Sequence, residues 1–380
     1  MHVEGYVLPA FEPVYAAFLS NFADYGEVGA SVCVYHRGKP VVDLAAGYLG
    51  PDSRRPYRLT TLQPVFSVSK GIVAIAANML ADRGALDLDA PVTCYWPEFA
   101  QKGKKRIPVR WLLTHQAGLA AMDDPISYEE LLAWDPVIRR LEEQAPNWEP
   151  GTAHGYHSLT YGFLVGEVVR RVTGQSIGQW ICRNITDPLG AEFFIGLPPE
   201  FSPRVAPALA FPPVKDSAAS TLRLAPGSLP YRAVAFVQPQ LNAMTVNDPV
   251  FRAAEVPSMN GIGTARGIAR MFAALIGDVD GQRLLSSAAM QRARAEQVRG
   301  PDLASIAVAE TALGLGFVLP TVDRPLGGPG SFGTMGLGGS RAWALPEADV
   351  AFAYVMNQLL DLNPDPRAEN LARATLQCLA

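Results

Sequence analysis

Phe66-Ser-Val-Ser-Lys-Gly71 contains an S-x-x-K element, in which Ser67 and Lys70 are three residues apart. An amphipathic segment follows at once and predicts a helix over residues 70–83, because its apolar residues recur on one face: Ile72, Ile75, Ala76, Met79 and Leu80. If this helix begins at Ser67, the hydroxyl and the amine lie one turn apart on the same face, within hydrogen-bonding reach. That geometry is typical of an activated serine nucleophile.

A serine hydroxyl is unreactive until a base removes its proton. A lysine, whose pKa is ordinarily about 10.4, becomes that base only where burial or positive potential lowers the value, and the positive end of the helix dipole would help. The spacing alone is not specific, since chance produces S-x-x-K in roughly one such chain in four, and a helix-capping serine beside a solvated lysine also fits. Ser69 is a rival nucleophile, but two residues along a helix point to different faces, which favours Ser67.

A second element runs from Pro150 to Ser158, with a Pro-Gly turn and then Tyr156, directly before a helix predicted over residues 159–172. Such a loop could place the phenol beside Ser67 and Lys70. A neighbouring ammonium would make the tyrosine anion accessible, so Tyr156 could be the base that the lysine assists. Taken alone, the residue is better explained as a packed aromatic side chain than as a catalyst.

A third element, Ser331-Phe-Gly-Thr-Met-Gly-Leu-Gly-Gly-Ser340, is glycine-rich and leads into a predicted strand. Glycines let a substrate approach the backbone closely, and a strand-edge N–H can donate to an oxyanion. A glycine-rich hairpin with no catalytic role fits the same residues. The spacing is not that of a phosphate-binding loop.

Composition limits the classes of protein that the chain can belong to. Hydrophobic residues make up 49% of its 380 residues, which excludes global disorder. Lys and Arg number 32 against 36 Asp and Glu, and no run of five basic residues occurs, so no nucleic-acid partner is expected. The four cysteines are scattered and contain no C-x-x-C pair, which argues against a disulfide framework and a zinc knuckle.

The N-terminus shows no basic region followed by an apolar stretch, so no secretory signal is expected. The apolar run from Ile72 to Ala77 is far shorter than the roughly 18 residues that a spanning helix needs. We therefore expect no membrane association and a cytoplasmic location.

Periodicity along the chain predicts an α/β architecture in which both termini build one sheet domain and a mostly helical region is inserted between them. Expected strands and helices of the termini are a helix over 11–22, a hairpin of strands 31–35 and 40–44, strands over 314–320, 337–345 and 350–356, and a helix over 365–379. Further helices are expected over 109–113 and 267–276. The Pro-rich stretch 196–258 predicts a long ordered loop that walls a pocket with Phe211, Tyr231 and Phe236.

The order of these elements resembles the serine β-lactamase and penicillin-binding-protein superfamily, and within it the family VIII carboxylesterases, which are similar to class C β-lactamases. The resemblance spans nearly the whole chain and rests on the hairpin 31–44, Phe66 to Gly71, Leu112-Leu-Thr-His-Gln-Ala-Gly-Leu119, Pro150 to Ser158, Asn260-Gly-Ile-Gly-Thr-Ala265, and Gly333 to Val355. It implies a two-lobed α/β fold with an antiparallel sheet flanked by terminal helices. The implied division is an α/β domain from 1–65 and 262–380 around a helical domain at 66–261.

The resemblance also implies roles for single residues. Ser67 would be the acylated nucleophile, with Lys70 and Tyr156 as its proton-transfer pair. Ser158 would polarise the lysine or position substrate, and the oxyanion hole would be the backbone N–H groups of Ser67 and Leu337. The triplet Thr334-Met335-Gly336 stands at the substrate-binding position where the lactamases have Lys-Thr-Gly.

The chain departs from the family pattern at that triplet. Thr334 carries no charge with which to hold a substrate carboxylate, which favours neutral esters as substrates. Arg341 could supply the missing charge only if its side chain lay on the same face of the sheet as Thr334. The two residues are seven apart along a strand, and this odd offset places them on opposite faces. His115 is expected to be a hydrogen-bonded loop residue. His154 and His157 lack a third ligand at supporting spacing, so we expect neither a metal site nor any other cofactor.

These observations predict a serine hydrolase that cleaves small neutral carboxylic esters through an acyl-enzyme. Alternatives on the same fold are a β-lactamase, a D-amino-acid peptidase or amidase, and an acyltransferase. A non-enzymatic alternative is a penicillin-recognising sensor or binding module. The expected partner is a small ester molecule, and the sequence predicts no oligomeric state.

Overall fold

Six strands, all paired antiparallel, form the main sheet. The computed structural model describes residues 1, 3–211, 225–305, 310–361 and 365–379. In spatial order, the strands are β1 (Val3–Val7), β3 (Lys39–Gly47), β2 (Gly29–His36), β13 (Val350–Met356), β12 (Arg341–Leu345) and β11 (Phe332–Met335). The N-terminal and C-terminal parts of the chain meet where β2 pairs with β13, as the sequence predicted.

The predicted hairpin is β2 and β3. His36 pairs with Lys39, so only Arg37 and Gly38 form the loop, and their φ angles are 52° and 72°. Positive φ at both central residues is the signature of a type I′ turn, whose twist matches that of the flanking strands. The turn sets the pairing of His36 with Lys39, and a bulge between Val34 and Tyr35 shifts the register for the buried remainder of both strands.

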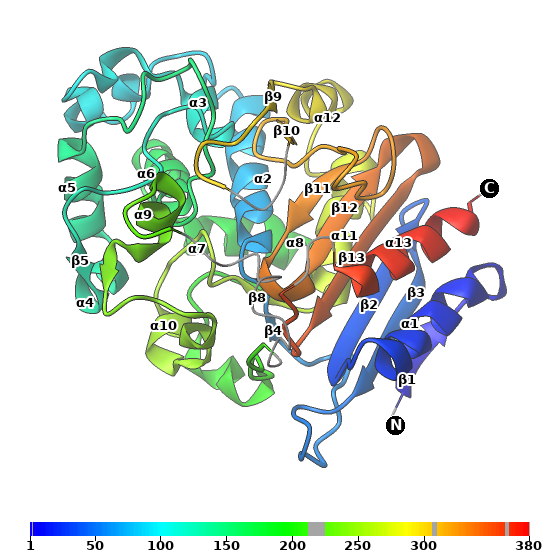
Figure 1. The fold of residues 1–380 in the computed structure, drawn as a ribbon. Coiled ribbons are helices and arrows are strands. Elements are labelled where there is room, and N and C mark those ends of the chain that lie inside the picture. Colours follow the sequence, from blue (N-terminus) through cyan, green and yellow to red (C-terminus); the bar gives the residue numbers. More distant parts are fainter. Residues whose placement is uncertain (2, 212–224, 306–309, 362–364, 380) are drawn as a thin grey trace.

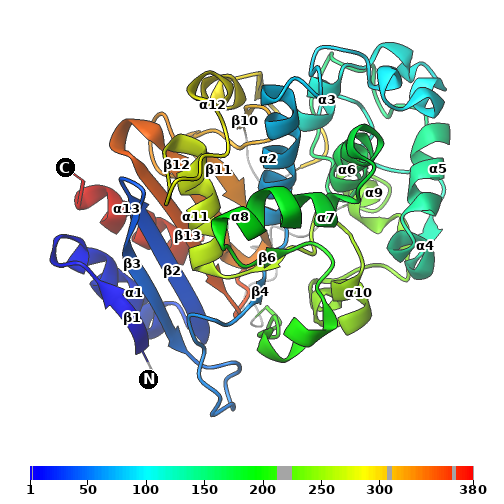
Figure 2. The same cartoon turned by 180° about the vertical axis from the view of Figure 1, so that it is seen from behind.

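Helices cover both faces of the sheet. The terminal helices α1 (Glu12–Asp24) and α13 (Pro366–Gln377) pack against each other on one face, and α11 (Ala265–Ile276) packs on β2, β12 and β13 from the other (Figures 1 and 2). The expected terminal helices are confirmed to within a few residues.

The helical region lies beside the β11 edge of the sheet, and α2 (Val68–Asp82) runs between the two (Figure 1). Because α2 is packed against α6, α7, α12 and β11, nearly all of its side chains are buried, including polar Ser69, Lys70 and Asn78. The other helices are α3 (Val109–Leu113), α4 (Tyr128–Leu132), α5 (Asp135–Glu143), α6 (Thr160–Thr173), α7 (Ile177–Ile181), α8 (Asp187–Leu189), α9 (Leu229–Ala235), α10 (Pro249–Ala253) and α12 (Ser287–Arg294).

The remaining strands are short and form three small sheets in the described structure. They are β4 (Gln63–Pro64), β8 (Ile262–Gly263) and β6 (Phe193–Phe194) in one small sheet, β9 (Val298–Gly300) with β10 (Thr311–Leu313), and the parallel pair β5 (Ile126–Ser127) and β7 (Val237–Gln238). The division into domains at residues 65/66 and 261/262 stays a prediction.

Three of the expected elements need correction. The strand over 314–320 is reduced to isolated bridges of Val318 with Leu313 and Gly333, because Gly316 with φ 84° breaks the extended run. The strand expected over 337–345 begins only at Arg341, since Leu337–Gly339 form a helical turn. The Pro-rich stretch contains α9 and α10, each with a proline in its first turn, where the missing N–H costs nothing. Residues 212–224 of that stretch lie outside the described residues.

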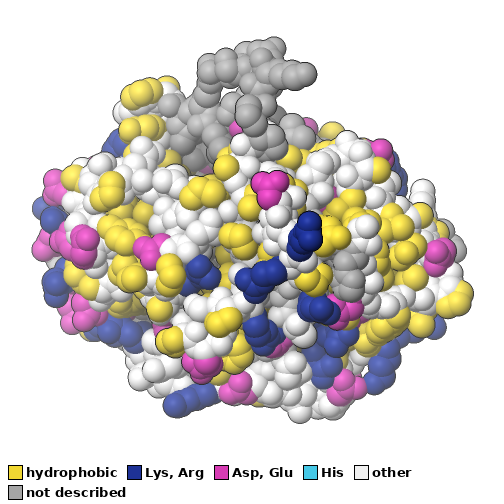
Figure 3. Space-filling view, turned by 90° about the horizontal axis from the view of Figure 1, so that it is seen from below, with side chains coloured by type: hydrophobic (Ala, Val, Ile, Leu, Met, Phe, Trp, Pro, Cys, Tyr) yellow, Lys and Arg dark blue, Asp and Glu magenta, His cyan; other side chains and the backbone are white. Residues whose placement is uncertain are grey.

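The surface has a mixed charge distribution on the face shown in Figure 3, where Lys and Arg side chains alternate with Asp, Glu and hydrophobic ones. Within the described ranges, no helix is both long and apolar enough to cross a bilayer.

Candidate active site

Ser67 lies at the turn that leads into α2. Phe66, directly before it, has φ 48°, a left-handed conformation that is strained for an aromatic residue and typical of functional sites. The Ser67 side chain makes no capping bond to the helix, so the hydroxyl is not used as an N-cap. Instead, Lys70 Nζ donates a hydrogen bond to Ser67 Oγ at 3.1 Å. The predicted one-turn spacing on a shared face is confirmed.

Lys70 is buried, and its amine also donates to the carbonyl oxygen of Ser258 at 2.9 Å. Burial lowers the pKa of Lys70 from its ordinary value, and Tyr156 offsets part of that shift. The Lys70 amine lies 4.8 Å from the centroid of the Tyr156 ring. A neutral lysine amine beside a serine hydroxyl is a competent base.

Tyr156 is fixed by its backbone and by its neighbours. Its N–H donates to Asp302 Oδ1 at 2.8 Å, and its ring lies 5.1 Å from that of His115, centroid to centroid. Ser158 lines the same cavity as Ser67, Lys70 and Tyr156. The Lys70 amine donates its two hydrogen bonds to Ser67 and Ser258. In the described part of the chain, Ser158 forms no hydrogen bond with this amine. Neither Asp302 nor the Ser258 carbonyl could be identified from the sequence, because their contacts join segments far apart in the chain.

The third sequence element lies directly against the start of α2. Thr334 Oγ1 donates to the Ser67 carbonyl oxygen at 3.2 Å. A Cβ atom on Gly71 would lie 2.8 Å from two side-chain carbons of Thr334, and one on Gly336 would lie 2.3 Å from the Val65 carbonyl oxygen. Glycine at both positions therefore lets β11 approach the helix. The approach brings Thr334, Met335, Gly336 and Leu337 into the wall of the cavity that contains Ser67.

Arg341 is among the residues that line the cavity, but its charge is paired with Glu369 and does not replace the charge missing at Thr334. Thr334 pairs with Ala342 and Met335 with Arg341, so Thr334 and Arg341 lie on opposite faces of the sheet, as expected. The Arg341 side chain is buried and paired with Glu369 of α13.

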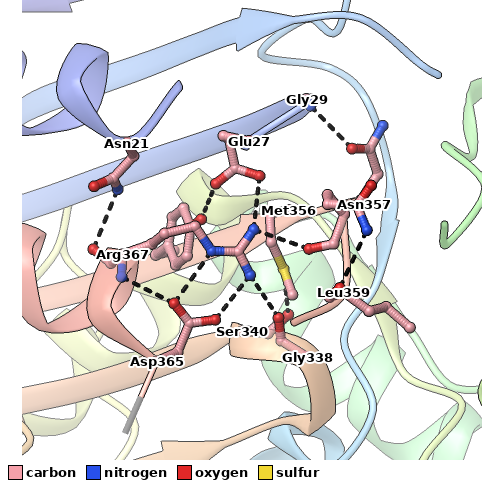
Figure 4. A network of polar contacts seen from close by, with 12 residues as sticks. Asn21, Glu27, Gly29, Gly338, Ser340, Met356, Asn357, Leu359, Asp365 and Arg367 are labelled. Carbon is pink, nitrogen blue, oxygen red and sulfur yellow. Dashed lines mark hydrogen bonds and ion pairs between the residues drawn. The ribbon is translucent and has the colours of Figure 1, made fainter. Parts of the chain in front are cut away.

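A buried polar network forms hydrogen bonds with the turn after β11 (Figure 4). Arg367 on α13 is fully buried and pairs with Asp365 and with Glu27, at 2.8 and 3.0 Å. It also donates to the carbonyl oxygens of Gly338 and Gln358, at 2.8 and 2.9 Å. The C-terminal helix is therefore bonded to the turn that contains Leu337.

The cavity has a volume of about 1060 Å³, room for a substrate well beyond a simple acetate. One of its walls comes from the Pro-rich stretch, as predicted, and includes Phe211, Tyr231, Leu241 and Met244. Phe236 is instead buried in the core and is not part of the lining. Asp302 and Arg324 line the cavity as well.

The histidines beside the cavity are structural. His115 accepts a hydrogen bond on Nδ1 from the His157 backbone N–H at 3.1 Å, and burial holds the pKa of His115 well below 6.5. Both ring nitrogens of His157 are engaged, with the Gly155 carbonyl at 2.6 Å and the Leu119 N–H at 2.9 Å, and burial lowers the pKa of this ring to about 4. His157 is therefore not available as a metal ligand. Over the described ranges, no group of three potential ligands is found.

Two other serines lie in motifs that could contain a nucleophile, and both have structural roles. Ser69 Oγ donates to the Phe66 carbonyl at 2.5 Å and accepts from the Gly261 N–H at 2.8 Å, which keeps it buried and away from the cavity. Ser176 is the centre of Gly174-Gln-Ser-Ile-Gly178, which matches the G-x-S-x-G of α/β-hydrolases. It follows helix α6, not a strand, and its side chain caps α7 and donates to Glu255 at 2.5 Å.

Comparison with known proteins agrees with this geometry. The sequence model of the family Beta-lactamase matches residues 16–377. Esterase/beta-lactamase LipL of Mycobacterium tuberculosis is 35% identical over 376 residues, which cover 94% of this chain and 83% of LipL. A crystal structure of a family VIII carboxylesterase is 37% identical and superposes with a TM-score of 0.90 over the whole of both chains. A penicillin-binding protein homolog from Caulobacter crescentus is 34% identical, with a TM-score of 0.87 and the same full coverage.

The family match and the full-length relatives confirm the resemblance, the two-lobed fold and the expectation of an esterase-like serine hydrolase. The alignments leave no large part of the chain unmatched. The chain belongs to the beta-lactamase family.

Proposed function

We propose that this protein is a serine carboxylesterase that cleaves small, uncharged carboxylic esters through an acyl-enzyme on Ser67. The observation that supports this most directly is the hydrogen bond of 3.1 Å between the Ser67 hydroxyl and the Lys70 amine, whose pKa is lowered by burial. In the proposed reaction, Ser67 Oγ attacks the ester carbonyl while its proton passes to the Lys70 and Tyr156 pair.

The remaining steps follow from the same groups. The N–H groups of Ser67 and Leu337 would stabilise the oxyanion, a contribution of several kcal/mol to lowering the barrier. The Lys70 and Tyr156 pair then returns the proton to the departing alkoxide, which leaves as the alcohol. Water attacks the acyl-enzyme with the same pair as base, and the acid is released while Ser67 recovers its proton.

The substrate class is proposed from two features of the cavity. The threonine at position 334 offers no charge beside the nucleophile, which favours an uncharged group there. The wall that includes Phe211, Tyr231 and Met244 is largely apolar and fits an alkyl or aryl chain.

The test compares hydrolysis of p-nitrophenyl acetate, butyrate and octanoate with that of nitrocefin, for the wild type and Ser67→Ala, with Ser69→Ala as the matched control. We expect ester turnover in the wild type and in Ser69→Ala, its loss in Ser67→Ala, and weak nitrocefin turnover. Near wild-type ester turnover by Ser67→Ala would refute the assignment.

The similarity to a penicillin-binding protein homolog supports a second candidate, a β-lactam-recognising enzyme or sensor. Nitrocefin turnover comparable with ester turnover would favour the lactamase. Stable acylation by a penicillin, without turnover of any ester, would favour the sensor.

A further inference from the structure

Arg324 is a cation in the cavity wall, and its side chain has no bonding partner among the residues that the structure describes. It lies in the loop before β11, where its backbone N–H donates to Thr321 Oγ1 at 3.2 Å. The side chain lines the cavity and is partly exposed to it. Its Nε atom is enclosed without a hydrogen-bond partner, and in the described parts of the chain the guanidinium forms neither a hydrogen bond nor an ion pair.

Two of the charged groups nearby, Asp302 and Arg341, already have partners. Asp302 accepts hydrogen bonds from the N–H groups of Tyr156 and Ala304, at 2.8 and 2.9 Å, and Arg341 is paired with Glu369. Burial lowers the pKa of Arg324; Tyr156, Asp302 and Asp323 partly offset this effect, and Arg341 adds to it. The positive charge of Arg324 is therefore poorly solvated and incompletely neutralised, which an anionic ligand would relieve.

We infer that Arg324 forms a subsite for a carboxylate on the alcohol portion of the ester substrate. A guanidinium is the side chain best suited to a carboxylate, since its planar fork can form two parallel hydrogen bonds. This inference rests on the proposed function and extends its substrate class from uncharged esters to esters with one remote carboxylate.

The position of Arg324 relative to Tyr156 assigns the carboxylate to the alcohol portion. Arg324 lines the same cavity as Tyr156 and is close enough for the two groups to interact electrostatically, and in the proposed reaction the Lys70 and Tyr156 pair returns the proton to the leaving alcohol. Groups next to Tyr156 therefore face the alcohol and not the acyl chain. Thr334 on β11, whose hydroxyl donates to the Ser67 carbonyl oxygen, is uncharged, so it leaves the carboxylate position to Arg324.

The test uses a pair of acetate esters that differ in charge but hardly in shape, 3-acetoxybenzoate and 3-acetoxybenzamide. We expect the wild type to prefer the benzoate by at least 10-fold in kcat/KM. Arg324→Gln should abolish that preference through a higher KM for the benzoate, with the benzamide unaffected. Arg324→Lys should retain part of the preference, because it keeps the charge and loses the fork.

Arg299→Gln is the matched control, since it also removes one positive charge but lies in β9, outside the cavity lining. It should behave as the wild type. Equal effects of Arg324→Gln on both esters, or no preference for the benzoate in the wild type, would overturn the inference.

Binding of the alcohol products separates this inference from the proposed function. Calorimetry on Ser67→Ala with 3-hydroxybenzoate and 3-hydroxybenzamide needs no catalysis. Tighter binding of the benzoate that is lost in the Ser67→Ala, Arg324→Gln double variant supports the subsite even if neither ester is hydrolysed. Equal binding of the two compounds rejects it even if both esters are good substrates.

Discussion

Arg367 Nη2 donates a hydrogen bond of 2.8 Å to the carbonyl oxygen of Gly338, which joins the C-terminal helix to the turn after β11. The same carbonyl accepts from the Leu360 N–H at 3.3 Å. Because Gly338 follows Leu337 directly, the orientation of the proposed oxyanion donor depends on a residue that does not line the cavity. Arg367 is thus a candidate positioning residue.

Arg367→Lys should lower kcat by about 10-fold with little change in KM, since small displacements of an oxyanion donor affect the transition state most. Lysine keeps the charge beside Glu27 and Asp365 but cannot reach all of their acceptors together with Gly338. Steady-state kinetics on p-nitrophenyl butyrate separates the two parameters. A rise in KM at constant kcat would argue against positioning of the oxyanion donor.

Stability should depend on pH through Glu27. Burial raises the pKa of this carboxyl to about 7, although Arg367 and Tyr354 oppose the shift. The folded state then holds a proton that the unfolded chain loses near pH 4.5, so the stabilising contribution is complete below that pH and is lost as the pH rises through 7. Between pH 5 and 7, urea unfolding should show the wild type losing up to about 1.4 kcal/mol per pH unit relative to Glu27→Gln. Parallel pH dependences in the two proteins would contradict the assignment.

The rate should depend on pH through Lys70. Because burial lowers its pKa, the neutral amine forms below pH 10.5, and kcat/KM should rise with pH along a limb centred below that value. Lys70→Arg remains protonated at every accessible pH, so we expect a loss of about 10³-fold and no such limb. A wild-type profile that is flat from pH 5 to 10 would show that this amine is not the base.

Ser69→Ala separates structure from catalysis in the S-x-x-K element. The change leaves the Gly261 N–H and the Phe66 carbonyl without their partner, which should cost about 1–3 kcal/mol of unfolding free energy. Turnover per folded molecule should stay within a few-fold of the wild type. Urea titration and active-site counting test the two parts independently, and a loss of turnover without destabilisation would revive Ser69 as the nucleophile.

The sequence predicted the parts of the fold and site that depend on local pattern. The hairpin, the terminal helices and α2 follow from periodicity and turn residues, and the spacing of Ser67 and Lys70 follows from the geometry of one helical turn. The glycine-rich element is recognisable in the sequence, but the strand predicted from residue 337 begins only at Arg341, because Leu337–Gly339 form a turn that α13 holds through a bond to Gly338.

Contacts between distant segments could not be predicted. The Ser258 carbonyl reaches the Lys70 amine, and Asp302 and Arg324 reach the cavity, from three separate loops. Nothing in their local sequence distinguishes them from ordinary loop residues. The prediction that Phe236 lines the cavity is wrong, because composition does not show which aromatic residue of an irregular segment faces the core.

Intact-mass spectrometry after rapid quenching tests the central claim, acylation of Ser67, most directly. With p-nitrophenyl butyrate, the wild type and Ser69→Ala should each gain one butyryl group on the peptide that contains Ser67, together with a burst of p-nitrophenol of about one equivalent if deacylation is slower than acylation. A p-nitrophenyl alkylphosphonate, which phosphonylates the serine with loss of p-nitrophenolate and is hydrolysed only slowly from it, traps the same serine where the acyl-enzyme is short-lived. Ser67→Ala should show neither the adduct nor the burst. An adduct of equal yield in Ser67→Ala, or one mapped to another residue of the wild type, would contradict the account.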